Sequence, residues 1–397
     1  MSYNLLKPTD LIKINKEKGL RVICNENTVI HCHHYNARLQ NTIESETSIS
    51  GKEIIREVAE QVYLQQILIL LKGKNYSISD SYKAIADLYS TMGYGNILFD
   101  KLEENIIYSN SSHFVSGWQC GSLRQDGMVC TIPEGFIAAA LFAVTGDGYQ
   151  VNEESCMNEE KQFCNFKIKK DLTKTIKPIQ LKIIEIPLIN DTDAASNINK
   201  QGVIDAVVTL PIYGNDYGLI PMFNVYLANT PQTFYNLVCL KYLEAMSNIG
   251  RDSIARLSLI RDAEFCAMNT FSGIMNSDEW LLLIKPMIKE KRDNVFGLIA
   301  VANALGWGRI FIKEHSSGDF LKLSVGNGYE AYGYQQLMNK ISKVGECLMM
   351  TGICSGTLSL IYQKGNFEER VGSFQTNEVM CLSKKDHHCE FHTVQAE

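Results

Sequence analysis

The sequence predicts an α+β protein: two tandem copies of one mixed α/β domain, each an antiparallel sheet with packed helices. First, an E-x2-C-x7-C-x-F motif occurs twice, as Glu153-Cys156-Cys164-Phe166 and Glu378-Cys381-Cys389-Phe391. Second, a G-x-G turn and a C-x4-G pattern precede each motif in the same order. Third, helical and β-like patterns are mixed without regular βαβ alternation, which is typical of the α+β class.

The upstream patterns keep nearly constant spacing between the copies. Cys130 and Cys347 stand 217 positions apart (347 minus 130), whereas the G-x-G turns at 93–95 and 306–308 are offset by 213 (306 minus 93). The E/C/C motifs are offset by 225 (378 minus 153), so the second copy carries an insertion, which we place at 364–372 as a hairpin tip.

In the first half, residues 52–71 carry one apolar stripe and predict an amphipathic helix. Ser79-Asp80 is expected to cap a second helix that ends at Ser90. The further elements that we expect are strands at 96–99 and 106–108, a buried helix at 135–144, a strand at 149–153, a polar hairpin tip at 156–164 and a strand at 165–168.

The second half repeats this order. We expect helices at 293–305, 334–344 and 352–362, with strands at 309–313 and 320–325. Residues 180–300 hold additional material, with a strand-like run at 203–212 and helical patterns at 234–247 and 279–289. The charged segment 167–178 contains a proline and is a candidate linker, so we divide the chain into domains 1–172 and 173–397.

Composition narrows the class of protein. A chain of 397 residues is too long for one ordinary core, and its net charge of −6 argues against nucleic acid and anionic membranes as partners. The longest apolar runs, such as 136–144, are shorter than the roughly 20 residues of a membrane span. The polar N-terminal segment lacks the apolar core of a signal peptide. The 12 cysteines include six at repeated positions, so we expect a cytoplasmic protein with bound metal instead of disulfides.

Two thiols and a carboxylate at short spacing are natural ligands of zinc, which prefers four tetrahedral ligands. We predict two zinc sites, one at Cys130, Glu153, Cys156 and Cys164, and one at Cys347, Glu378, Cys381 and Cys389. Cys354 competes with Cys347 for the second site. Each site needs cationic or N–H neighbours, for which Lys167 and Lys384 are candidates. The alternative is that these are ordinary buried cysteines.

The run of C-x4-G, apolar helix and E-x2-C-x7-C-x-[FV] resembles the 4-vinyl-reductase domain family, over about residues 80–170 and 295–393. The resemblance implies a fold similar to vesicle-tethering complex subunits and haem nitric-oxide-binding domains. In phenol-responsive members it also implies a zinc ion held by three cysteines and a glutamate beside a pocket for a small aromatic molecule. Unlike those activators, this chain shows neither a Walker-type ATPase motif nor a C-terminal DNA-binding helix-turn-helix.

Other patterns are weaker. The tract His31-Cys32-His33-His34 is compatible with a second kind of metal site, but a polar strand end explains it better. The G-x-G turns lack the third glycine of a dinucleotide loop. A haem would need an axial ligand such as His113, and Glu330 is near its place in the second copy. Aromatic residues could line an apolar pocket or simply fill the core: Phe114, Trp118, Tyr329, Tyr332 and Tyr334.

These observations favour a zinc-binding protein that binds a small hydrophobic or aromatic molecule and acts as a sensor or regulatory scaffold. The alternatives are an accessory protein or reductase acting on a tetrapyrrole vinyl group, and a pure interaction scaffold. No G-x-S-x-G or H-E-x-x-H pattern is present, so the sequence indicates no catalytic residues and favours a function other than catalysis. Assembly with a second copy or a partner protein stays open.

Overall fold

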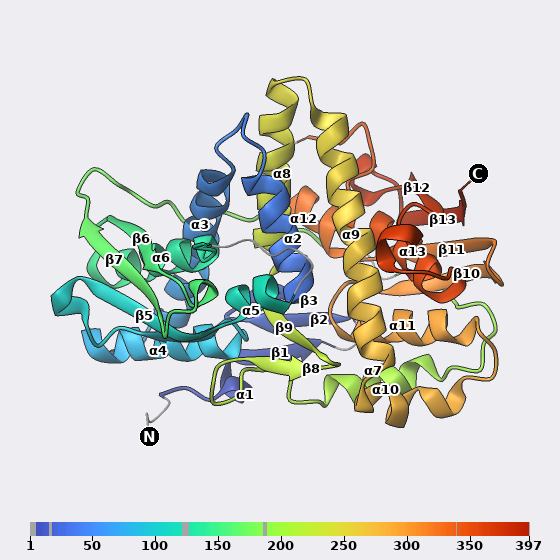
Figure 1. Ribbon diagram of the computed structural model, residues 1–397, viewed down its shortest axis with the longest axis horizontal. Coiled ribbons are helices and arrows are strands. Elements are labelled where there is room, and N and C mark those ends of the chain that lie inside the picture. Colours follow the sequence, from blue (N-terminus) through green and yellow to red (C-terminus); the bar gives the residue numbers. More distant parts are fainter. Residues whose placement is uncertain (1–4, 16–17, 121–126, 186–188, 339, 397) are drawn as a thin grey trace.

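The computed structural model describes residues 5–15, 18–120, 127–185, 189–338 and 340–396. It contains three antiparallel sheets with helices packed around them. Figure 1 shows a four-stranded sheet on either side of the molecule and a five-stranded sheet between them. The prediction of an α+β fold with antiparallel sheets and packed helices is confirmed.

The five-stranded sheet combines strands from both halves of the chain, in the order β1-β2-β3-β9-β8. Its strands are β1 (Ile12–Asn15), β2 (Leu20–Ile23), β3 (Glu26–Cys32), β8 (Ile220–Met222) and β9 (Val225–Pro231). Two of its hairpins close with a two-residue turn in which both residues have positive φ: Cys24–Asn25 and Phe223–Asn224. Such turns match the twist of the strands that they join.

These two hairpins are related like the halves of a symmetric dimer. Asn25 and Asn224 stand 199 positions apart (224 minus 25). Ile30 and Asn229 have the same separation, and they pair directly across the β3–β9 ladder. In an antiparallel pair, a position that faces its own counterpart lies on a twofold axis. The chain therefore forms, within itself, the kind of interface that joins two subunits.

The helices after the hairpins continue this relation. Helix α2 (His33–Glu44) and helix α8 (Gln232–Asn248) both begin directly after the inner strand of their hairpin. We call Leu20–Lys170 the first repeat and Ile220–Gln395 the second. Part of the material at 180–300, taken from the sequence as additional, thus belongs to the duplicated unit.

The first repeat continues with a four-stranded sheet in the order β4-β5-β7-β6. Its strands are β4 (Gly95–Leu98), β5 (Ile106–Ser112), β6 (Tyr149–Ser155) and β7 (Cys164–Lys170). Its helices are α3 (Gly51–Leu71), α4 (Ile78–Thr91), α5 (His113–Cys120) and α6 (Thr131–Thr145), with 3-10 turns η1 (Leu102–Glu104) and η2 (Met157–Glu159). The cap of α4 is Ser77, whose side chain accepts the Asp80 N–H, in place of the predicted Ser79-Asp80.

The second repeat has the matching sheet order β10-β11-β13-β12. Its strands are β10 (Ile310–Ser316), β11 (Phe320–Val325), β12 (Phe374–Met380) and β13 (Cys389–Gln395). The remaining helices of the chain are α1 (Pro8–Leu11), α7 (Lys200–Val208), α9 (Asp252–Met275), α10 (Asp278–Leu283), η3 (Lys285–Met287), α11 (Asp293–Ala304), α12 (Tyr329–Leu337), α13 (Leu348–Tyr362), α14 (Phe367–Arg370) and η4 (Leu382–Lys384).

In each repeat, a glycine at the equivalent position lets two long helices cross closely. A Cβ at Gly135 on α6 would lie 2.5 Å from the Ala59 Cβ on α3. A Cβ at Gly352 on α13 would lie 2.2 Å from the Ile260 carbonyl oxygen on α9. Gly135 and Gly352 are the glycines of the two C-x4-G patterns, and both make the same kind of helix–helix contact. The C-x4-G pattern therefore combines a cysteine of each cluster with a glycine that allows close helix packing.

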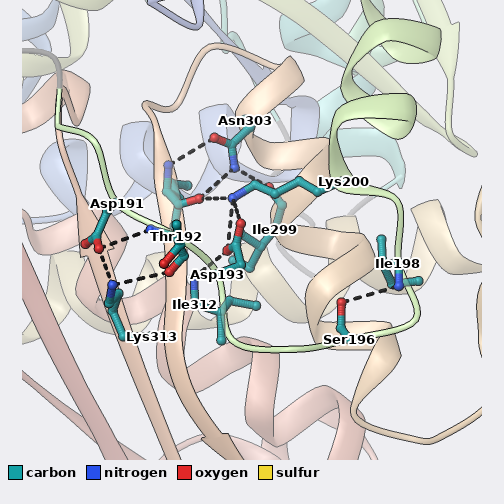
Figure 2. A network of polar contacts seen from close by, with 11 residues as sticks. Asp191, Thr192, Asp193, Ser196, Ile198, Lys200, Ile299, Asn303, Ile312 and Lys313 are labelled. Atoms are coloured by element: carbon teal, nitrogen blue, oxygen red, sulfur yellow. Dashed lines mark hydrogen bonds and ion pairs between the residues drawn. The ribbon is translucent and has the colours of Figure 1, made fainter.

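Figure 2 shows how the connecting segment before α7 binds to the open edge of β10. The Ala194 N–H donates to the Ile312 carbonyl at 2.6 Å, and the Ile312 N–H donates to the Asp193 carboxylate at 2.8 Å. Lys200 pairs with Asp193 at 2.8 Å and fixes that carboxylate. The edge of the sheet is thereby covered, which removes an open template for strand addition.

Three predicted elements are wrong. The run at 203–212 was expected to be a strand, but α7 occupies Lys200–Val208 and packs against α11. The helix expected at 334–344 is α12, which ends at Leu337. The inserted segment 364–372 is not a hairpin tip, because α14 lies within it behind an Asn366 capping box. The domain division at 172 stays a prediction, and no helix among the described residues is long and apolar enough to cross a membrane.

Candidate metal centres and ligand cavity

The first cluster brings Cys130, Glu153, Cys156 and Cys164 together, with their ligand atoms all within 4.8 Å of one another. Cys130 is the N-cap of α6, Glu153 lies on β6, and Cys156 and Cys164 flank the turn that joins β6 to β7. A β-bulge between Glu153 and Ser155 interrupts the ladder and redirects the chain at this point. All four residues are buried.

The second cluster repeats this geometry with Cys347, Glu378, Cys381 and Cys389. Cys347 is the N-cap of α13, Glu378 lies on β12, and a bulge between Glu378 and Met380 matches the bulge of the first repeat. The eight predicted ligand residues thus form two separate groups of four, and each group could hold a metal ion.

The sulfur separations indicate what the clusters can hold. The Sγ atoms are 3.6–4.0 Å apart in the first cluster and 3.6–3.9 Å apart in the second. A disulfide would need about 2.05 Å. Thiolates placed tetrahedrally about 2.3 Å from one ion would be about 3.8 Å apart. The cysteines therefore have the spacing of ligands around a shared ion.

The two carboxyl groups support the same interpretation. One oxygen of Glu153 accepts the Cys130 N–H at 3.0 Å, and one oxygen of Glu378 accepts the Cys347 N–H at 3.1 Å. The other oxygen of each group is buried without a hydrogen-bond partner. Burial and the neighbouring Cys156 raise the pKa of Glu153 to about 8, and burial with Cys381 raises the pKa of Glu378 to about 9. Burying an oxygen without a partner costs free energy, and a cation bound to that oxygen removes the cost.

Backbone N–H groups, not lysines, surround the sulfurs. The Met157 N–H donates to Cys164 and the Leu382 N–H donates to Cys389, both at 3.4 Å. Lys167, which we expected to offset the cluster charge, instead pairs with Glu154 at 3.0 Å at the surface. Lys384 pairs with Asp386 at 3.7 Å, so its charge too is used outside the cluster. The hairpin turn itself supplies the donors, through the amides of η2 and η4.

Cys354 is buried on α13 but is not part of the second cluster, which contains Cys347. The histidine tract spans the end of β3 at Cys32 and the start of α2 at His33, and His31 is buried among aromatic rings. Among the described residues, the only groups with metal-ligand geometry are the two Cys/Glu clusters. The counterpart of His113 is Tyr329 and not Glu330, because each begins its helix and donates its N–H to the residue within the G-x-G turn.

A narrow cavity of about 30 Å³ lies in the second repeat. Its walls come from α8, α9, α12 and the first turn of α13, and Tyr35 of the first repeat closes one side. Tyr329 and Tyr334 line it, as the sequence suggested, whereas Phe114 and Trp118 are core residues of the first repeat. The cavity adjoins the second cluster because Leu348 and Met349 in its wall directly follow Cys347.

Glu330 is a half-buried acidic residue of this cavity, whose other acidic residue, Glu346, pairs with Arg256. Its two oxygens accept the N–H groups of Met349 and Met350, at 2.7 and 3.0 Å. It therefore satisfies the otherwise unpaired amides at the N-terminus of α13. Desolvation raises the pKa of the Glu330 carboxyl group to about 8.

Sequence reasoning missed the α8 side of the cavity, including Tyr235 and Cys239. The Tyr235 hydroxyl donates to Asn36 of the first repeat at 2.6 Å, and Asn36 in turn lies 2.8 Å from His113. The signal that could have related α8 to α2 is the hairpin before each helix, because Gly19, Leu20 and Asn25 recur as Gly218, Leu219 and Asn224 at the same separation of 199.

Comparison with known proteins leaves the family open. No protein-family model matches the chain, and no curated protein matches it. Among solved structures, the chain is similar to the phenol-responsive sensory domain of the transcription activator PoxR with phenol, at a TM-score of 0.37 and 12% sequence identity. The match covers 50% of this chain and 90% of that chain. Similarity at this level does not identify the function, so the functional argument has to come from the clusters and the cavity.

Proposed function

We propose that the chain is a ligand sensor or regulatory scaffold that binds a small hydrophobic or aromatic molecule in the second repeat and contains two structural zinc ions. One observation carries the proposal. Helix α13 begins directly after Cys347 of the second cluster, and its first two residues line the cavity. The same helix end therefore connects the metal centre with the ligand cavity.

Zinc fits the donor set better than other common ions. Three thiolates and one carboxylate suit zinc, whereas calcium and magnesium prefer oxygen ligands. Four protein ligands close the site and leave no position for a catalytic water, so the ion would supply folding free energy and hold the hairpin to the helix. Cys130 and Cys347 would hold it from the helix, and the other ligands from the strands.

The cavity is too small for an aromatic ring without movement. The volume of about 30 Å³ is only about one fifth of that of a cavity of about 150 Å³, which can hold benzene. Met349 is the most adaptable side chain in the wall, because methionine is unbranched and flexible. A bound molecule would displace Met349 and with it the first turn of α13. Occupancy would then alter the second cluster, which gives the protein a route from ligand to hairpin.

The test is the affinity for a small aromatic probe, p-cresol, with and without metal. Metal-loaded protein should bind p-cresol, and removal of the ions by a chelator should weaken binding at least tenfold, because the start of α13 loses its anchor. Cys381→Ser, which opens the second cluster, should weaken binding in the same way. Cys156→Ser, which opens the first cluster, is the matched control and should leave the affinity within about twofold.

Unchanged affinity after verified loss of both ions would contradict the coupling. The tetrapyrrole alternative gains no support from this cavity, since a macrocycle is far larger than its 30 Å³. A reductase assay on a vinyl tetrapyrrole belongs beside the binding test, and turnover without added protein partners would favour the enzyme alternative.

A further inference from the structure

The two repeats differ in the space that corresponds to the ligand cavity. Equivalent positions can be assigned because α2 and α8, α5 and α12, and α6 and α13 begin at matching residues. Gln40 and Cys239 are each the eighth residue of their helix, and Glu44 and Leu243 are each the twelfth. Thr131 and Leu348 are the first residues of α6 and α13.

In the first repeat, polar side chains close this space. The Gln40 side-chain amide donates to the Val129 carbonyl at 2.9 Å and to the Glu44 carboxylate at 3.1 Å. The Thr131 hydroxyl donates to the same Glu44 oxygen at 2.6 Å. This network joins α2 to the head of α6 across the position that is open in the second repeat. Gln40 and Thr131 are each only 2% exposed, whereas Glu44 is half-buried, so the network runs from the core toward the surface.

In the second repeat, the equivalent residues leave the space free. Cys239, Leu243 and Leu348 all line the cavity, and none of them can form such a bridge between the helices. The side chain of Cys239 ends at Sγ, two atoms short of a glutamine amide group, so it cannot form the same hydrogen bonds to the start of α13. The polar network is thus replaced by an apolar wall in one repeat only.

A second exchange adds the Glu330 carboxyl group to the open cavity. Phe114 and Glu330 are each the second residue of their helix, α5 and α12. Glu330 is bonded to the Met350 N–H, and the equivalent of Met350 in the first repeat is Pro133, which has no N–H. At this position the first repeat has no N–H group that could donate to a carboxyl group. The apolar ring of Phe114 stands where Glu330 stands in the second repeat.

We propose that the second repeat binds the ligand, that the first repeat is a closed structural copy, and that one hydroxyl-bearing aromatic molecule binds per chain. This inference rests on the proposed function and deepens it. The ligand class follows from Glu330, whose oxygens each keep a lone pair beyond the one used by the backbone N–H. A ligand hydroxyl can both donate and accept, so it pairs with this carboxyl group in either protonation state. Four tyrosines of the lining offer ring faces and edges to an aromatic ligand: Tyr35, Tyr235, Tyr329 and Tyr334.

Equilibrium dialysis of the metal-loaded full chain with p-cresol and toluene tests the proposal. We expect p-cresol to saturate at one molecule per chain and to bind at least tenfold more tightly than toluene, which has the same ring and no hydroxyl. Cys239→Gln, which introduces the side chain of the first repeat, should weaken p-cresol binding at least tenfold. Cys239→Ala, which keeps the space open, should bind within about threefold of the unaltered chain.

Gln40→Ala is the matched control in the first repeat and should leave the affinity and stoichiometry of the site in the second repeat unchanged. Metal content and circular dichroism should be the same in all variants, which separates a closed cavity from a misfolded chain. Two equal p-cresol sites per chain, or undiminished binding by Cys239→Gln, would overturn the asymmetry and leave the proposed function standing. If neither p-cresol nor toluene binds, the proposed function is overturned as well.

Discussion

At the residue scale, Cys347 and Cys354 show how position on one helix decides the role of a cysteine. Both are buried on or next to α13, two turns apart. Cys347 has the Cys381 and Cys389 sulfurs within 3.9 Å, whereas Cys354 belongs to neither cluster. A thiol in the first environment can ligate an ion, and a thiol in the second acts as a small apolar side chain.

We therefore predict that Cys381→Ser lowers the zinc content by about one ion per chain, because loss of one ligand opens a closed site. The free energy of unfolding should fall by several kcal/mol, since structural zinc contributes directly to folding. Cys354→Ser should retain the ion and cost on the order of 1 kcal/mol. Elemental analysis and urea unfolding measure both effects. Loss of zinc from Cys354→Ser, with retention by Cys347→Ser, would contradict the assignment.

His31 predicts a dependence of stability on pH. It is 1% exposed, with the Tyr35, Tyr235 and Trp307 rings packed against it, and burial lowers its pKa to about 3. The folded pKa is below the unfolded value of about 6.5, so the stability that neutral His31 contributes is present above pH 6.5 and is lost as the pH falls. At pH 5 the loss should be about 2 kcal/mol.

His31→Gln removes the titrating group and keeps an amide near Tyr329, whose hydroxyl lies 3.2 Å from the histidine Nε2. The difference in unfolding free energy between the unaltered chain and this variant should shrink by about 2 kcal/mol from pH 7 to pH 5. Comparing the two proteins at each pH cancels the pH dependence of metal binding, which they share. A difference that stays constant over this range would show that His31 becomes protonated without cost.

At the element scale, the crossing of α9 and α13 depends on two glycines one turn apart. A Cβ at Gly352 would lie 2.2 Å from the Ile260 carbonyl oxygen, and a Cβ at Gly356 would lie 2.5 Å from the Glu264 carbonyl oxygen. The close contacts are with backbone atoms, which cannot move aside as a flexible side chain can. Helix α13 must therefore shift as a whole to accommodate a side chain at either position.

We predict that Gly352→Ala costs about 2–3 kcal/mol through overpacking, although alanine favours a helix more than glycine does. Ser355→Ala, on the same buried helix, is the control and should change stability by less than about 1 kcal/mol, because the Ser355 hydroxyl bonds only to carbonyls of its own helix. Urea midpoints measure the two variants. A neutral or stabilising Gly352→Ala would mean that the helices can separate without cost.

The elements that sequence reasoning located are those with a chemical signature. The two E-x2-C-x7-C-x-F motifs led to the hairpins β6–β7 and β12–β13, because ligand-type residues at fixed spacing require one geometry. The β2–β3 and β8–β9 hairpins escaped notice because their turns, Cys24–Asn25 and Phe223–Asn224, lack the glycine that usually marks positive φ. The pairing of Ile30 with Asn229 across β3 and β9 shows that they are equivalent, and a short G-L-x4-N pattern at 19–25 and 218–224 agrees with it.

Helix α7 was mistaken for a strand for a different reason. The run at 203–212 is rich in β-branched and apolar residues, which favour strands on propensity alone. In the structure, Asn199 caps the helix through the Gly202 N–H, and Val203 and Val207, one turn apart, are buried where α7 packs against α11. Packing against a neighbouring helix outweighed local preference, and the neighbour is about 90 residues away in sequence.

At the scale of the whole molecule, the two repeats form an internal pseudo-dimer. The β3–β9 ladder joins them, the Trp307 indole donates to the Ile30 carbonyl at 2.8 Å, and the Thr42 hydroxyl of α2 donates to Asp262 of α9. These contacts join buried parts of the first repeat directly to buried parts of the second. Neither repeat can lose its structure without exposing buried residues of its partner.

We therefore predict that the repeats unfold together, although chains of this length usually unfold in steps. Trp118 lies in the first repeat and Trp280 in the second, and both are buried. Two variants that share Trp307→Phe, one keeping only Trp118 and the other only Trp280, report on each repeat separately. Their urea midpoints should agree within about 0.3 M. Their m-values should be equal, because the m-value of each variant reports the surface that the whole chain exposes on unfolding. Separate midpoints in the metal-loaded protein would mean that the β3–β9 ladder joins two independently stable domains. Coincident midpoints would make ligand binding in the second repeat a source of stability for the first.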